Sequence, residues 1–100
     1  MALKERYDFA NLHNMMEEGV LTELERQLEA IADEDLCKCN DCVLDMACFS
    51  LNSLTPKYRS SLMGGIYARA ELDEHEEQVR QAVSSAIERV SQNPLCENFR

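Results

Sequence analysis

The chain of 100 residues is 45% hydrophobic and 29% charged, with only three glycines and two prolines, a composition typical of a globular, helix-forming domain. This length excludes a two-domain enzyme, and we expect residues 1–100 to form a single domain. Nineteen acidic residues against ten basic ones give a formal net charge of −9, which disfavours binding to DNA, RNA or anionic lipid.

The first long helix is predicted between Asn14 and Ala32. Apolar residues recur there at four-residue spacing, and glutamates occupy other positions, as in an amphipathic helix with one buried face. The apolar positions are Met16, Val20, Leu24 and Leu28. For the ten or so residues before this helix we expect an arm that is either disordered or forms a short helix.

A second helix is predicted around residues 43–51, which are apolar at most positions. Such a helix is expected to be central and buried on most sides. Asn40 or Asp41 is expected to cap its first turn, and Pro56 disfavours its continuation. Cys48 lies on this helix, and we expect its thiol to point into the core.

The segment from Lys57 to Ala70 leaves two alternatives open. Thr55 can cap a short helix with Pro56 at its first position, although the Gly64-Gly65 pair would break that helix. Residues 66–68 can equally be extended.

The third long helix is predicted from Leu72 to Gln92 and ends at Asn93-Pro94. Acidic residues near its start and Arg89 near its end suit the helix dipole. Its apolar face is formed by Leu72, Val79, Val83, Ala86, Ile87 and Val90. Together these elements predict a mainly α domain of three to four helices.

No stretch of the sequence approaches the roughly 18 apolar residues that a membrane span needs, and the N-terminal residues lack the apolar core of a signal peptide. We therefore expect a cytoplasmic protein without a membrane partner. In a reducing compartment, the five cysteines are better explained as metal ligands or buried thiols than as disulfides.

Three cysteines, Cys37, Cys39 and Cys42, precede the second predicted helix. A C-x-x-C pair at a helix start is typical of half a zinc knuckle, because backbone N–H groups there stabilise thiolates. Cys37 is close enough to supply a third sulfur, and Cys96, beyond the third helix, is the best candidate for the fourth. A site with four sulfur ligands has no open coordination position, so zinc held there would be structural.

Two other interpretations of the cluster are three reduced thiols in a loop and a thioredoxin-like redox pair. The redox motif needs a preceding strand, whereas a helix is predicted here. His75-Glu76-Glu77-Gln78-Val79 lacks the second histidine of a zinc protease motif, and no Ser-His-Asp grouping or phosphate-binding glycine loop is present. We therefore predict that the protein is not an enzyme.

The stretch between Met46 and Ala70 contains no acidic residue. Its cations, Lys57, Arg59 and Arg69, and the ring of Tyr58 suit a phosphate diester stacked on an aromatic side chain. The alternative is a turn with solvated cations and an exposed tyrosine.

Several of these motifs together resemble the ComFB late-competence family. They are Cys39-x-x-Cys42-x-x-Asp45, Ser50-Leu51-Asn52, Leu54-x-Pro56-x-Tyr58 and Gly65-x-Tyr67, and the resemblance spans roughly residues 15–96. It implies a small, helical, cytoplasmic homodimer with structural zinc on Cys37, Cys39, Cys42 and Cys96.

The same resemblance implies a regulatory module that binds a cyclic dinucleotide such as cyclic di-GMP. The ligand residues would be Lys57, Tyr58, Arg59 and Arg69. The alternative function is a structural or adaptor protein, in competence or motility regulation, that binds a protein partner without a nucleotide.

Overall fold

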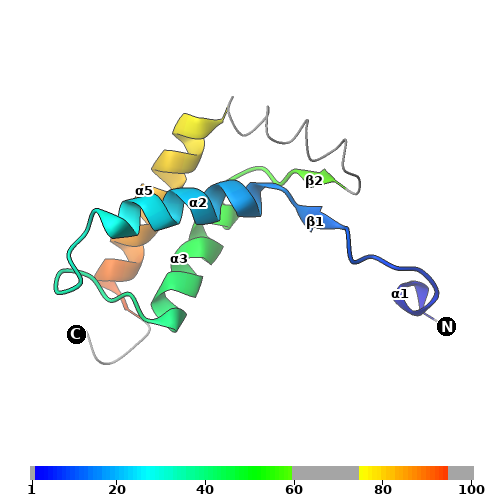
Figure 1. The fold of residues 1–100 in the computed structure, drawn as a ribbon, viewed down its shortest axis with the longest axis horizontal. Coiled ribbons are helices and arrows are strands. Elements are labelled where there is room, and N and C mark those ends of the chain that lie inside the picture. The colour runs from blue at the N-terminus through cyan, green and yellow to red at the C-terminus, as the bar shows by residue number, and fades with distance from the viewer. Residues whose placement is uncertain (1, 60–74, 95–100) are drawn as a thin grey trace.

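The computed structural model of the chain describes residues 2–59 and 75–94. Within these residues the chain is mainly helical, as predicted, with two very short strands (Figure 1). The elements are α1 (Leu3–Arg6), β1 (His13–Asn14), α2 (Met16–Glu29), α3 (Asn40–Asn52), β2 (Tyr58–Arg59) and α5 (Glu76–Gln92). None of the helices described in these two ranges has the length and hydropathy that a bilayer span requires.

The core lies where α2, α3 and α5 pack against one another. The predicted apolar positions of α2 and α5 form this core, because residues three and four apart share one face of a helix. Its most deeply buried members include Val20, Met46, Val83 and Val90. The helices predicted at 14–32 and 72–92 are confirmed over 16–29 and 76–92, and residues 72–74 lie outside the described ranges.

Helix α3 is central, as predicted, but only one of its faces is buried. Cys42, Met46 and Ser50 recur at four-residue spacing on the inner face, and the buried Ser50 hydroxyl donates to the carbonyl of Met46 at 2.8 Å. Leu44 is 60% exposed, and Cys48, four residues later, is also exposed. The prediction of a buried Cys48 is therefore wrong, since α2 and α5 cover α3 from one side.

The two strands form a short antiparallel ladder in which His13 pairs with Arg59 and Asn14 with Tyr58. The side chain of Asn14 strengthens this junction, because its Oδ1 accepts from the N–H of Met16 at 3.1 Å and from that of Lys57 at 2.8 Å. Residues 58–59 are extended, so the alternative of a short helix from Pro56 does not continue through them. The remainder of that segment, 60–70, lies outside the described residues.

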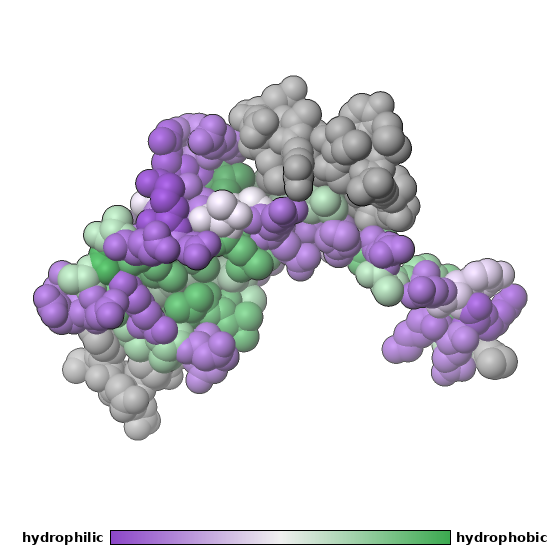
Figure 2. All heavy atoms as spheres, in the orientation of Figure 1, coloured by the Kyte–Doolittle hydropathy of each residue, from purple (hydrophilic) through white to green (hydrophobic). Residues whose placement is uncertain are grey.

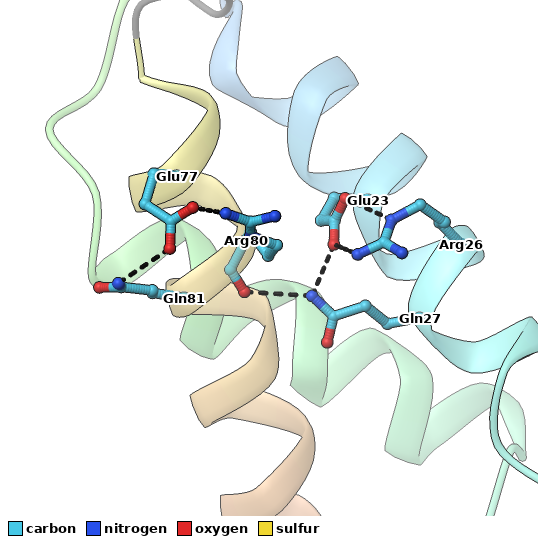
Figure 3. Close-up of polar contacts among 6 residues, drawn as sticks. All are labelled: Glu23, Arg26, Gln27, Glu77, Arg80 and Gln81. Atoms are coloured by element: carbon cyan, nitrogen blue, oxygen red, sulfur yellow. Dashed lines mark hydrogen bonds and ion pairs between the residues drawn. The ribbon is translucent and has the colours of Figure 1, made fainter.

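A polar contact joins α2 to α5 beside the core (Figure 3). Gln27 Nε2 donates to Glu23 Oε2 at 2.6 Å and to the carbonyl oxygen of Arg80 at 3.1 Å. Arg26 donates twice to the Glu23 carboxylate. The hydrogen bond from Arg26 lowers the pKa of Glu23, against the opposing effect of burial.

Residues 2–12, which we call the N-terminal arm, extend away from the helical body (Figure 1). The arm carries α1 and no buried residue. Its hydrogen bonds lie within the arm or reach His13 directly after it.

Candidate metal centre

Cys37, Cys39 and Cys42 meet in space as their spacing predicts. Their three sulfur atoms all lie within 4.8 Å of one another. Cys37 and Cys42 are buried, and Cys39 is half-buried. The site is therefore largely closed to solvent, with sulfur as its only ligand type among the described residues.

The start of α3 positions two of these sulfurs. Cys39 is the N-cap residue, with extended backbone angles of φ −71° and ψ 163°, and its Sγ accepts from the N–H of Cys42 at 3.4 Å. The prediction that Asn40 or Asp41 caps this helix is wrong, because a cap must precede the first helical turn and both residues lie inside it. The sulfur of Cys39 therefore lies at the positive end of the helix dipole.

Lys38 anchors the loop that carries the first two cysteines. Its Nζ donates to the carbonyl oxygens of Leu28 and Ile31 at 2.8 and 2.5 Å, and to Asp33 Oδ1 at 2.8 Å. These carbonyls belong to the end of α2 and the turn after it, where the regular helical hydrogen bonds run out. The Leu28 carbonyl also accepts from the N–H of Ile31 at 3.2 Å. The hydrogen bond from Lys38 also lowers the pKa of the exposed Asp33.

The role of Lys38 was not predicted from the sequence. The available signal was its position between two cysteines, since adjacent side chains in an extended segment point to opposite sides. The ammonium of Lys38 reaches the carbonyl oxygens at the end of α2. The lysine thus fixes the loop without itself being a ligand.

The donor set fits zinc. A tetrahedral zinc ion with Zn–S bonds of about 2.3 Å holds its sulfur ligands about 3.8 Å apart. Since the three sulfurs lie within 4.8 Å of one another, no pair has to close by more than about 1 Å. Thiolates are soft ligands that favour zinc over magnesium or calcium.

The end of α5 lies beside this cluster. Pro94 and Cys37 line one cavity of about 250 Å³, together with Leu36 and Val90. Pro94 is the last described residue, so Cys96, predicted as the fourth ligand, lies outside the described part of the chain. The chain nevertheless leaves α5 next to Cys37.

The family model of the late competence development protein ComFB matches residues 13–94. This chain belongs to the ComFB family. A solved structure, described as the structural characterization of the late competence protein ComFB from Bacillus subtilis, is similar with a TM-score of 0.71 and 25% sequence identity. The similarity covers 86% of this chain and 97% of that chain. Among the curated proteins, none matches the chain.

The ComFB resemblance also predicted a nucleotide site around Lys57. The structure brings Lys57, Tyr58 and Arg59 together only as neighbours along the chain at β2, while Arg69 lies outside the described residues. Tyr58 is 56% exposed, which agrees with both interpretations of this segment. These residues follow the C-terminal end of α3, whereas the cysteine cluster lies at its N-terminal end (Figure 1).

Proposed function

We propose that this ComFB-family chain is a cytoplasmic, non-enzymatic, homodimeric regulatory module with one structural zinc ion in each subunit. The observation that carries the proposal is the group of three cysteine sulfurs at the start of α3, which lie within 4.8 Å of one another. A sulfur-rich, largely buried site suits a structural ion, because catalysis by zinc needs an open coordination position.

In this proposal, Cys96 supplies the fourth ligand. Support comes from Pro94, which lines the same cavity as Cys37, since two further residues extend the chain by at most about 7 Å. Zinc bound in this way would join the loop after α2, the start of α3 and the segment after α5. It would stabilise the fold by linking elements that are distant in sequence.

The proposed homodimer is supported by the outer face of α3. Leu44 and Cys48 lie four residues apart on this face, and both are exposed. Apolar residues grouped on an exposed helix face are typical of a protein interface. A second copy would also supplement the small core of a domain of this size.

The ligand that we propose is a cyclic dinucleotide of the cyclic di-GMP type, bound by Lys57, Tyr58, Arg59 and Arg69. The exposed ring of Tyr58 offers a surface for base stacking, and the neighbouring cations suit phosphate. A two-fold symmetric ligand also suits a symmetric dimer, since each half would meet the same residues of a different subunit.

Native mass spectrometry with and without excess cyclic di-GMP tests these proposals, because one spectrum reports subunits, metal ions and nucleotides. We expect a dimer with two zinc ions that takes up nucleotide. Cys42→Ser should lose zinc, whereas Cys48→Ser, which changes an exposed cysteine outside the cluster, should retain it. A zinc-containing dimer without nucleotide would contradict the proposed ligand and favour the adaptor function, and a metal-free wild-type protein would contradict the zinc site.

A further inference from the structure

The N-terminal arm exposes its large apolar side chains. Leu3, Tyr7, Phe9 and Leu12 are 60%, 56%, 42% and 54% exposed. The arm projects from the body (Figures 1 and 2), and it precedes residue 13, where the family match begins. Exposed apolar residues concentrated in one short segment indicate a surface that contacts another protein.

An apolar groove runs along the C-terminal part of α2, away from the end of this helix that the arm precedes. It has a volume of about 690 Å³, and Figure 2 shows apolar surface in the region between α2 and α3. Leu21, Leu24, Leu28, Ile31 and Val43 supply its apolar lining, and Glu25, Glu29, Asp33 and Lys38 are its charged residues. Leu21 is 55% exposed, so the groove has an uncovered apolar wall.

We propose that the N-terminal arm of one copy docks into the groove along α2 of a second copy. The inference rests on the proposed homodimer and names a contact within it. The arm leaves its own body before the first turn of α2 and extends away from the C-terminal part of this helix (Figure 1), whose residues line the groove. A reciprocal exchange of two arms uses the same contact twice and closes at a dimer.

Charge favours the arm over a direct contact between two grooves. The groove carries three acidic residues and one lysine, a net charge of −2, so two facing grooves would repel each other. The arm is neutral, because Lys4 and Arg6 balance Glu5 and Asp8. It places both of its cations in α1, beside Leu3 and Tyr7, where they can meet Glu25 and Glu29 at the groove.

Photocrosslinking of the full chain tests this contact. Phe9 is replaced by p-benzoylphenylalanine in ¹⁵N-labelled protein, which is mixed and exchanged with unlabelled protein that lacks the probe. After irradiation, the crosslinked peptides are identified by mass spectrometry. We expect links between labelled and unlabelled chains that join the arm to residues 21–33 or to Val43.

Two variants of the unlabelled chain make the test specific. Leu21→Asp places a charge in the groove and should reduce these links at least tenfold. Thr22→Asp adds the same charge at the next position of α2, which is exposed and outside the groove lining, and should leave the links unchanged.

Links within one chain, links to another surface, or no links at all would overturn the arm exchange. An equal loss with both variants would also overturn it. Native mass spectrometry of the same samples separates this failure from that of the proposed function, because a zinc-containing dimer without the predicted links contradicts the arm contact alone.

Discussion

Replacing Lys38 by methionine should destabilise the protein more than its position in a surface loop suggests. The ammonium group of Lys38 donates to the carbonyl oxygens of Leu28 and Ile31 and to the carboxylate of Asp33. Methionine keeps much of the apolar stem but donates no hydrogen bond. The substitution therefore leaves two carbonyls at the end of α2 without their charged donor.

The size of the stability loss expected for Lys38→Met follows from these contacts. A hydrogen bond that involves a charged group contributes roughly 1.5–3 kcal/mol, so the two carbonyl bonds give about 3 kcal/mol at the low end of that range. The Lys38 side chain is 24% exposed, so in the variant water can form part of the missing hydrogen bonds to these carbonyls. We therefore expect the free energy of unfolding to fall by about 2 kcal/mol. For a domain of this size, that corresponds to a fall in Tm of about 8–16 °C.

Chemical denaturation at 25 °C, followed by circular dichroism, measures this loss. Asp33→Asn is the matched control, because it removes only the ion pair of Lys38 with a carboxylate that is 93% exposed. Such exposed pairs contribute little to stability. A loss below about 0.5 kcal/mol for Lys38→Met, or an equal loss for both variants, would refute the anchoring role.

Three further results are expected. Because the folded protein lowers the pKa of Glu23 from its ordinary value of 4.5, this carboxylate stabilises the fold above that pH, and the contribution disappears as the pH falls through the folded-state pKa. The stability advantage of wild type over Glu23→Gln should therefore shrink on acidification in urea titrations between pH 6 and 3, and an advantage that stays constant over this range would contradict the ion-pair contribution. Val83→Ala should cost about 2–3 kcal/mol by the same assay, since Val83 is fully buried and loses two methyl groups. Ser84→Ala, at the next and exposed position of α5, should cost under about 0.5 kcal/mol. Free zinc at 100 times its Kd raises the free energy of unfolding by about 2.7 kcal/mol. Removal of zinc by a chelator should therefore lower Tm by about 10–20 °C in a thermal melt. An unchanged Tm would contradict a structural ion.

Much of the fold was predictable because its signals are local. The four-residue recurrence of apolar side chains in α2 and α5 identifies both the helices and their buried faces, since helix geometry alone places those residues on one side. The cysteine cluster was predictable for a similar reason. Cys37, Cys39 and Cys42 are so close along the chain that one loop and one helical turn bring their sulfurs together.

The burial of α3 was less predictable, because this helix is apolar on most sides. Periodicity identifies a buried face only when the opposite face is polar. Met46 and Cys48 are both reasonable core residues by composition, and the packing of α2 and α5 against one side alone decides that Met46 is buried and Cys48 exposed.

By itself, the sequence determined the helical class, the family and the grouping of three cysteines, because each depends on residues close together along the chain. The tertiary structure alone decided that the sulfur of Cys39 caps α3, that Lys38 binds the end of α2, and that Pro94 lies beside Cys37. Each of these contacts depends on the path of a loop or on the meeting of two helices. Local propensity cannot specify such a meeting, since it depends on which surfaces are covered when the whole chain packs.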